Sequence, residues 1–536
     1  MLQCRKKKYP SVKKLLLLLV IVIFSARFAS AQSVYIPYSY QLDQKLNSTV
    51  YSIDNADHTT LKPFFLDSAL MPAYNIIMMR SIDTTRKHWI PRKIFNEHLF
   101  DIQNKEYTFY GDYLTDFGAG KDFANHVNTY INTRGYQFGG TVGDKFFFYT
   151  SGYENQGKFP PYYTAAIDKI DFVPGQAYSR EFATPDWSYA TTILSYSFSK
   201  HFNVTLGEDK TFIGDGYRSL LLSDFAANYP LLRLTGTVGK LQYMVMWAYF
   251  EDINQPKFDS FGSNRRKWAA FHYLDYNFSK RFSVGFFDAI IIPEADDNGN
   301  FHSFDPNFVS PVFLNSLNPT PSQPDNALIG FTAKYKIFDK TAIYGQLLFD
   351  RFNSSSLFSN SNNSNTNGVQ LGIRGADLFK VTHFNYLFEF NTVKPYTYQG
   401  NQSISSYTEY SEPLGDPLGA NFREFIGILN YQAGRFDFMG QLNYAKYGLD
   451  PQNADYGMDV TQPYIPINTP TFIGQGISTN LVYAQGTVAF IINPKTNLRF
   501  ELGGVYRYQS NYLGSNKTEW VTFGIRSSFR GLYSDF

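Results

Sequence analysis

The segment Arg435-Phe-Asp-Phe-Met-Gly-Gln-Leu-Asn-Tyr-Ala-Lys-Tyr447 alternates between two kinds of side chain at every second position. Its even-numbered positions begin with two phenylalanines and continue with glycine, leucine and tyrosine, whereas Asp437, Gln441 and Asn443 occupy the opposite face. A period of two is that of a β-strand, and an apolar face opposite a polar face suits a barrel wall with a polar interior. We therefore expect a long strand here.

The same alternation recurs at residues 267–278 and 521–530. In the second of these, Val521 and Phe523 share one face while Thr522 lies opposite. We expect this last strand to close the sheet and to end in Phe536.

Tight and mostly basic turns separate such segments. Each turn has about ten residues of strand-like sequence on both sides, which suits short hairpins between antiparallel neighbours. The turns lie at residues 143–145, 199–201, 239–240, 279–281, 339–340, 378–380, 434–435 and 493–495. Between successive turns lie two strands joined by a longer and more variable connection. Alternating short turns and long loops are typical of outer-membrane barrels, with the turns in the periplasm and the loops outside.

This rhythm predicts eighteen strands, eight periplasmic turns and nine outer loops, with both ends of the barrel in the periplasm. The strands are expected to begin near Tyr107, Asn128, Lys145, Trp187, His201, Pro230, Leu241, Lys267, Arg281, Ala327, Thr341, Gly368, Val381, Asn421, Arg435, Thr479, Thr496 and Lys517. The predicted fold class is all-β: a transmembrane, antiparallel outer-membrane β-barrel of about 18 strands, preceded by a short, partly helical periplasmic region.

The composition agrees with a membrane barrel. Aromatic residues make up 18% of the chain, yet the mean hydropathy is negative. No stretch after residue 31 offers the roughly twenty consecutive apolar residues of a membrane helix. A barrel hides its apolarity by alternation and places aromatic girdles at both interfaces. A soluble β-sandwich would alternate similarly, but it would not readily explain eighteen strands, the aromatic excess and a terminal phenylalanine together.

Residues 1–31 have the features of a cleavable signal peptide. A basic stretch precedes the apolar run at residues 15–24, and Ala29-Ser30-Ala31 supplies the small residues that a signal peptidase reads. The alternative is an uncleaved anchor, although the run is too short to span a bilayer. Cleavage before Gln32 removes Cys4, the only cysteine, so the mature chain has no disulfide and no thiol. It also removes seven basic residues, which changes the formal charge from +2 to −5 and disfavours nucleic acid as a partner.

The mature chain divides into two predicted parts. Residues 32–105 are expected to form a periplasmic pre-barrel segment, acting as a cap or partial plug with possible helices such as residues 89–98. Residues 106–536 form the barrel. The Ser/Asn-rich loop at 352–368 is expected at the cell surface. Five other loops are long enough to fold over the outer mouth or into the lumen: residues 157–186, 211–229, 291–326, 397–420 and 448–478.

The search for catalytic or metal-binding motifs is negative. None of the eight histidines belongs to an HExxH pair, and no GxSxG nucleophile motif is present. A phospholipase-type barrel would need a Ser–His pair near the outer interface. His272 and His383 lie on predicted strands without a marked serine partner, and we interpret them as interface or lumen imidazoles. We predict no enzyme, no cofactor and no metal site.

The richest segment is LGEDKTFIGDGYRSLLLSDFAANYP at residues 206–230. Its charged and aromatic side chains are the candidate ligand-binding residues: Glu208, Asp209, Asp215, Tyr217, Arg218 and Asp224. Two interpretations stay open. The segment can be a constriction loop braced by Asp–Arg pairs, with its three leucines against the barrel wall. It can also contact a carbohydrate, since Asp and Arg hydrogen-bond hydroxyls and Tyr offers a flat apolar face.

Several motifs carry a resemblance to a known family. The strongest is GDGYRSLLLSD at 214–224, accompanied by NTRG at 132–135, ENQ at 154–156 and PLGDPLG at 413–419. With these motifs the chain resembles the Wzi-like capsule-assembly barrels, and within them the branch that includes the gliding-motility protein RemB. The resemblance covers residues 89–536 and implies an eighteen-stranded barrel with periplasmic helices.

The same resemblance implies a function and partners. It implies a non-enzymatic outer-membrane lectin that holds surface polysaccharide on the cell, or, in the gliding branch, a surface protein that assists movement. The expected partners are surface polysaccharide, outer-membrane lipid and lipopolysaccharide, and periplasmic or motility-machinery proteins. A diffusive porin is a further alternative, because eighteen strands can enclose a channel; the long inner segments argue against it.

Overall fold

The computed structural model describes residues 34–35, 37–66, 69–180, 184–254, 257–258, 261–301, 306–311, 326–351, 366–465 and 470–536. The predicted signal peptide at residues 1–31 lies outside the described residues, as does most of the Ser/Asn-rich loop at 352–368.

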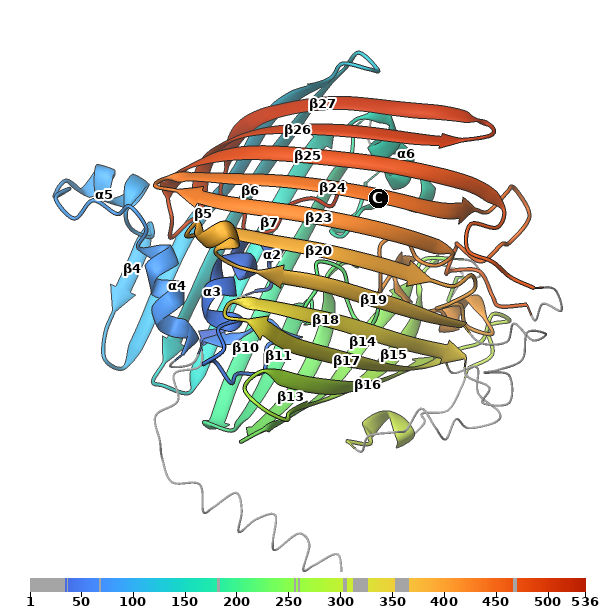
Figure 1. Ribbon diagram of the computed structural model, residues 1–536, viewed down its shortest axis with the longest axis horizontal. Coiled ribbons are helices and arrows are strands. Elements are labelled where there is room, and N and C mark those ends of the chain that lie inside the picture. Colours follow the sequence, from blue (N-terminus) through green and yellow to red (C-terminus); the bar gives the residue numbers. More distant parts are fainter. Residues whose placement is uncertain are drawn as a thin grey trace, which may run out of the picture.

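Eighteen long antiparallel strands of the described chain form one closed barrel (Figure 1). They are β5 (Tyr107–Asp122), β6 (Val127–Val142), β7 (Phe146–Lys158), β10 (Asp186–Ser199), β11 (Phe202–Asp209), β13 (Tyr229–Val238), β14 (Leu241–Asp252), β15 (Arg265–Asn277), β16 (Phe282–Pro293), β17 (Asn326–Phe338), β18 (Thr341–Arg351), β19 (Thr366–Gly375), β20 (Phe384–Val393), β23 (Phe422–Ala433), β24 (Phe436–Leu449), β25 (Ile477–Asn493), β26 (Leu498–Asn511) and β27 (Gly514–Arg526). The barrel closes where β27 pairs with β5, from Trp520 opposite Asp122 to Arg526 opposite Asp116. A short strand, β4 (Phe100–Gln103), continues this seam along the other end of β5.

The predicted fold class is confirmed, and the strand positions agree closely with it. Every barrel strand begins within three residues of its expected start, and the short connections lie at the expected turns. Gly239 and Gly434 open two-residue turns at φ 62° and 56°, a left-handed backbone that glycine adopts without steric cost.

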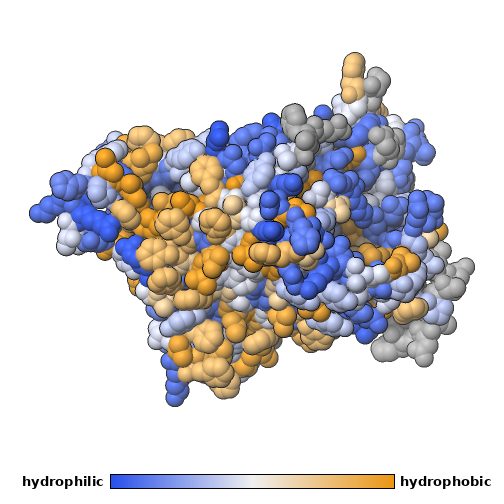
Figure 2. Space-filling model, turned by 90° about the horizontal axis from the view of Figure 1, so that it is seen from above, coloured by the Kyte–Doolittle hydropathy of each residue, from blue (hydrophilic) through white to orange (hydrophobic). Residues whose placement is uncertain are grey.

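The outer wall of the barrel is apolar. On β24 the outward-facing Leu442 is 58% exposed, whereas the inward-facing Gln441 and Asn443 are 7% and 1% exposed. A broad band of hydrophobic residues lies between the hydrophilic ends of the molecule (Figure 2). Closing an antiparallel sheet into a barrel pairs the backbone N–H and C=O groups of every strand, as the interior of a bilayer requires. The apolar band on its outer surface is stable against lipid and not against water. The protein is therefore an outer-membrane barrel.

The interior is only partly polar, which corrects the expectation of a polar lumen face throughout. The inward face of β14, β15 and β16 carries Met244, Met246, Phe271 and Phe287, all with no exposed surface. These side chains belong to one apolar cluster with three consecutive leucines of the 210–228 loop. The lumen is apolar here because a loop, and not water, fills it.

The residues before the barrel form small elements at its short-turn end and inside it (Figure 1). They are β1 (Val34–Tyr35), α2 (Tyr40–Asp43), η1 (Gln44–Leu46), α3 (Asn47–Val50), β2 (Leu61–Lys62), β3 (Phe65–Leu66), α4 (Leu70–Met78) and α5 (Trp89–Phe95). The helix expected within residues 89–98 is α5. It contacts the short turns, since Asn493 donates to the main-chain oxygens of Lys93 and Glu97 at 3.2 and 2.9 Å. Among the described helices, none has the length and apolarity needed to cross a membrane.

The outer loops carry the remaining elements. These are α6 (Pro161–Ile170), β8 (Phe172–Val173), β9 (Ala177–Tyr178), β12 (Phe212–Ile213), η2 (Pro306–Val309), η6 (Ser403–Ser405), β21 (Thr408–Glu409) and β22 (Glu412–Pro413), with η5 (Leu378–Lys380) in a short turn.

The chain does not end in a barrel strand, which corrects the expectation that the last strand runs to Phe536. Strand β27 stops at Arg526, and the amides of Ser527 and Ser528 both donate to the Asp116 carboxylate, at 2.8 and 3.1 Å. Residues 527–536, here called the lumenal tail, turn into the barrel. Phe536 packs against α6 in an outer loop, so the tail crosses the lumen from the short-turn end.

Candidate functional site

The segment with the candidate ligand-binding residues, here called the inner loop (residues 210–228), connects β11 to β13 through the lumen. Side chains of the wall hold its backbone. Gln346 accepts from the amide of Leu220 at 2.8 Å and donates to the carbonyl of Ile213 at 2.9 Å. Glu389 accepts from the amides of Tyr217 and Arg218 at 2.9 and 3.1 Å. Backbone groups that leave a sheet and enter a dry interior need such partners, and the inward-facing side chains of β18 and β20 supply them.

Asp215 joins the inner loop to the segment before the barrel. Its carboxylate accepts hydrogen bonds from the hydroxyls of Tyr51, Thr59 and Thr60 at 2.8–3.0 Å. Lys334, on β17, lies 3.7 Å away. Burial alone would raise the pKa of Asp215, but the nearby lysines and these hydroxyls together hold that pKa well below its usual value. The carboxylate is therefore charged and fully engaged.

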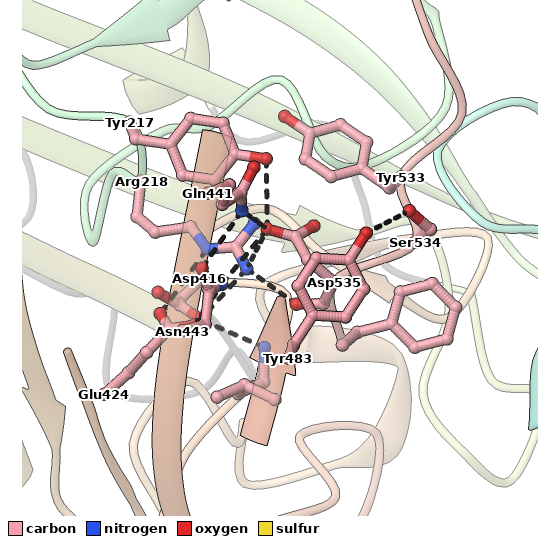
Figure 3. A network of polar contacts seen from close by, with 12 residues as sticks. Tyr217, Arg218, Asp416, Glu424, Gln441, Asn443, Tyr483, Tyr533, Ser534 and Asp535 are labelled. Atoms are coloured by element: carbon pink, nitrogen blue, oxygen red, sulfur yellow. Dashed lines mark hydrogen bonds and ion pairs between the residues drawn. The ribbon is translucent and has the colours of Figure 1, made fainter. Parts of the chain in front are cut away.

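Arg218 lies at the centre of a second network (Figure 3). Its guanidinium is 3.4 Å from the Glu424 carboxylate on β23, 3.1 Å from the Asp535 carboxylate and 2.9 Å from the main-chain oxygen of Asp535. Gln441 and Asn443 also donate to Asp535, at 2.6 and 3.2 Å. The network thus ties the inner loop, the barrel wall and the lumenal tail together in a buried place.

The lumenal tail makes further contacts along its length. Arg530 pairs with Asp209 at the end of β11. The Tyr533 hydroxyl donates to Asp224 at 2.5 Å, and the Ser534 hydroxyl is 2.7 Å from that of Tyr483. Near the outer end, Arg507 donates to the main-chain oxygen of Phe536 at 3.1 Å. The tail is therefore bonded to the inner loop and to the wall.

A second loop, residues 394–421, covers the inner loop from the outside and contains the PLGDPLG motif. The hydroxyls of Tyr398 and Tyr407 donate to the carbonyls of Leu220 and Leu221 at 2.7 and 2.6 Å. The amide of Ser223 donates to the carbonyl of Leu414 at 2.8 Å. The two most distinctive motifs of the sequence therefore meet, and their contact is structural.

The structure brings five of the six predicted site residues into the lumen. Asp209, Asp215 and Arg218 are at most 3% exposed, and each has a partner of opposite charge. Tyr217 donates to Asp535 at 3.0 Å, and Asp224 accepts from Tyr533. Glu208 is separate from them: it is exposed on the outward face of β11, in line with Leu206. These contacts agree with the first of the two interpretations, in which the segment is a constriction loop braced by Asp–Arg pairs with its leucines against the barrel wall. Sugar contact by the six residues stays a prediction.

Sequence reasoning missed the partners of this loop. Lys334, Arg374, Glu389 and Glu424 are inward-facing charges on strands of the barrel, each at most 4% exposed. They could have been recognised in the sequence as charged residues on the polar face of predicted strands. Asp535 gave no such signal, because it follows the last strand and its partner Arg218 is more than three hundred residues away.

This arrangement holds the inner loop and the lumenal tail against the barrel wall. Its buried charges are paired with opposite charges or hydrogen-bonded, which makes buried charge tolerable. In the described part of the chain, no three His, Cys, Asp or Glu side chains are placed to hold a metal ion. A lumenal cavity of about 450 Å³ lies near the short turns and is lined by tyrosines that include Tyr74, Tyr110 and Tyr149.

The outer loops also present aromatic side chains to solvent. Among them are Tyr178 (49%), Phe261 (93%), Phe301 (65%), Tyr456 (40%) and Phe472 (66%). Two of these loops touch, since Lys169 on α6 lies 3.5 Å from Asp459. These exposed aromatic side chains can be reached by a ligand from outside the cell, whereas the buried network around Arg218 cannot.

No protein-family model matches the chain. No curated protein sequence matches it either. Among solved structures, the chain is similar to Wzi of Escherichia coli, an outer-membrane protein involved in group 1 capsule assembly and a carbohydrate-binding β-barrel. The two share 13% identity and a TM-score of 0.54 over 92% of this chain and 99% of Wzi. At this identity the similarity shows the fold alone, a closed β-barrel.

Outer-membrane proteins of Pseudomonas aeruginosa are also matched. OprD shares 9% identity over 80% of this chain and 96% of its own, with a TM-score of 0.41. OpdK with vanillate shares 8% identity over 77% and 97%, with a TM-score of 0.43. At these identities the comparisons concern the fold alone.

Proposed function

We propose that this protein is a non-enzymatic outer-membrane barrel that binds or retains capsular polysaccharide at the cell surface, and that it is a relative of the Wzi-like capsule-assembly barrels. The similarity to Wzi over almost the whole length of both chains supports the kinship at the level of fold. The motifs quoted from the sequence support it further.

The main observation behind the proposal is that the loops at the outer end of the barrel are supported from inside. The inner loop, the 394–421 loop and the lumenal tail meet inside the barrel and hold one another through buried hydrogen bonds. The outer loops therefore rest on a filled interior, as a binding platform does, and not on an open channel mouth. A preorganised surface binds with less loss of conformational freedom than a mobile one.

The exposed aromatic residues are the proposed contact points for the glycan. Sugar rings present apolar C–H faces, and aromatic side chains offer a flat apolar surface for them, while nearby amides and charged groups hydrogen-bond the hydroxyls. In this proposal Tyr456 and Phe472, in the 450–476 loop, touch polysaccharide. Asp215, Tyr217 and Arg218 act indirectly, because they hold the loops in place.

The deciding experiment measures how surface polysaccharide divides between cells and medium in a strain that lacks this gene. If polysaccharide is made in normal amount but released, and if the intact gene restores attachment, the proposal holds. Polysaccharide that stays on the cells of the deletion strain would refute it.

Two alternatives have separate tests. A diffusive porin would give large, steady conductance steps in planar bilayers, and the filled lumen leads us to expect none. A gliding-motility or surface-adhesion component would leave polysaccharide attachment unchanged and reduce spreading of the deletion strain.

Periplasmic proteins remain proposed partners. The helices at the short-turn end expose Ile76 (70%) and Met79 (60%) close to α4, and Trp89 (61%) and Ile90 (62%) on α5. An apolar surface of this kind, placed on the periplasmic side, is where we propose that such a partner docks.

A further inference from the structure

The barrel wall has a shallow groove on its lipid-facing side. It runs across the outward faces of β17 to β20, β23 and β24, adjacent strands on the front of the barrel (Figure 1), and has a volume of about 1020 Å³. Small residues form its floor, among them Ala333, Gly345 and Gly427. Aromatic side chains border it, with Phe425 54% and Tyr444 46% exposed.

Two cations lie directly above this groove, towards the long loops. Arg423 on β23 and Lys446 on β24 are exact register partners, and both are exposed on the outward face. One row below them on the same strands are Phe425 and Tyr444, which are also paired. Lys394, exposed just beyond β20, is the diagonal neighbour of Arg423.

Their height places these cations at the outer edge of the bilayer. Eleven residues separate Arg423 from the Gly434 turn, and at ~3.3 Å per residue with a ~40° tilt the distance along the barrel axis is roughly 28 Å. This is close to the ~25 Å height of the apolar band of such barrels. The outward residues of β23 and β24 below the cations are apolar, aromatic or glycine. The charges therefore lie where lipid headgroups begin.

In the part of the chain that the structure describes, these three cations have no carboxylate partner. Within the described ranges, no Asp or Glu oxygen lies within 4.0 Å of Lys394, Arg423 or Lys446. Like charges directly opposite on neighbouring strands destabilise a sheet. Lys517, elsewhere on the outer rim, by contrast lies 2.6 Å from the Glu519 carboxylate. An anion between Arg423 and Lys446 would remove the repulsion.

We propose that this face binds lipopolysaccharide, with a lipid A phosphate on Arg423, Lys446 and Lys394 and an acyl chain in the groove below. Charge-assisted hydrogen bonds to phosphate are among the strong ones, and each basic residue near a membrane surface adds to the attraction for anionic lipid. The cations face the outer leaflet, where the abundant anionic lipid is lipopolysaccharide. The groove and its cations face lipid, whereas the exposed aromatic residues proposed for the glycan lie in the outer loops.

The test uses the purified full-length barrel in detergent. It is incubated with phosphorylated lipid A, with dephosphorylated lipid A or with phosphatidylglycerol, passed through a sizing column and analysed by mass spectrometry for bound lipid. Lipid A contains no capsular sugar, so the result does not depend on the proposed function. We expect the phosphorylated lipid to bind best, and the R423Q/K446Q double variant to bind it about 30-fold more weakly.

Two further variants make the result specific. The K121Q/K517Q double variant removes two other outward cations from β5 and β27 and is expected to bind lipid A like the unaltered protein. A333W fills the groove without touching a charge and is expected to weaken binding. Heat-modified mobility on gels verifies that each variant is folded. Unchanged binding by R423Q/K446Q, or equal binding of the dephosphorylated lipid or of phosphatidylglycerol, would overturn the proposal.

Discussion

At the scale of single residues, Arg218 is a buried cation that depends on its partners. It is 2% exposed and faces the carboxylates of Glu424 and Asp535. Removing one member of such a group leaves charge buried without a partner, which costs more than the pair itself contributes. Arg218 is thus expected to matter for stability before it matters for any ligand.

We predict that R218M lowers the free energy of unfolding by about 3–5 kcal/mol. R218K should lose less, since it keeps the positive charge. The measurement is the urea midpoint of the barrel folded into lipid vesicles. The matched control is K517M, which breaks an exposed pair with Glu519 and should leave the midpoint unchanged. Equal midpoints for R218M and K517M would show that the buried network contributes little.

Asp215 gives a prediction about pH. Its pKa in the folded protein is lower than in the unfolded chain, so its ionised form stabilises the fold. That contribution is complete above the unfolded value of about 3.9 and is lost as pH falls towards the lower folded value. We expect D215N to be less stable than the unaltered protein at pH 7 and the difference to shrink below about pH 4. Unfolding midpoints measured from pH 7 to pH 3 test this, and a constant difference would contradict it.

At the scale of elements, the sequence predicts strands well because their signal is local. Alternation and turn residues fix β23, the turn at Gly434 and β24 without reference to any other part of the chain. The lumenal tail shows where this reasoning fails. Alternation continues through Phe529 and Arg530, yet the strand stops at Arg526 because the Asp116 carboxylate takes the next two amides.

Removing the end of the tail tests its role as a plug. A variant lacking residues 531–536 keeps every barrel strand and the Arg530–Asp209 pair, but loses the contacts of Asp535 with Arg218 and of Ser534 with Tyr483. We expect conductance steps in planar bilayers from this variant and none from the full-length chain. The single substitution F536A, which keeps the tail, is the control.

Should the shortened chain fail to fold, D535A with Y533F provides a second route. It removes the Asp535 carboxylate from Arg218 and the hydrogen bond of Tyr533 to Asp224, and it keeps the tail. If neither folded variant shows conductance steps, the tail contacts are not needed to block the lumen, and the role of the tail as a plug is refuted.

At the scale of the whole molecule, the candidate site could be located but not understood from the sequence. The inner loop was identifiable because charges, glycines and leucines are concentrated in it, and its leucines do pack against the wall. Its partners come from β17, β20, β23 and the tail, more than a hundred residues away. Such pairings depend on the closed barrel, and no local pattern encodes them. The same holds for Arg423 and Lys446 above the lipid-facing groove, because only the register of β23 and β24 shows that they are neighbours.

The platform hypothesis makes a prediction for the intact cell. Tyr456 and Phe472 lie in one outer loop and are 40% and 66% exposed, so replacing both with alanine should leave the barrel folded. If they contact glycan as aromatic anchors do, each contributes about 2 kcal/mol, which is about 30-fold in affinity per residue. We therefore expect the Y456A/F472A strain to release polysaccharide into the medium with a normal amount of barrel in the membrane.

The matched control for that strain is Y512A. Tyr512 is 76% exposed in the turn between β26 and β27, so it tests whether any exposed outer tyrosine has the same effect. Release by Y456A/F472A alone would assign the glycan to the 450–476 loop. Equal release by both strains would indicate a general disturbance of the surface. Retention by both would refute the assignment of the glycan to the 450–476 loop and would direct mutagenesis to other exposed aromatic residues of the outer loops, such as Tyr178, Phe261 and Phe301.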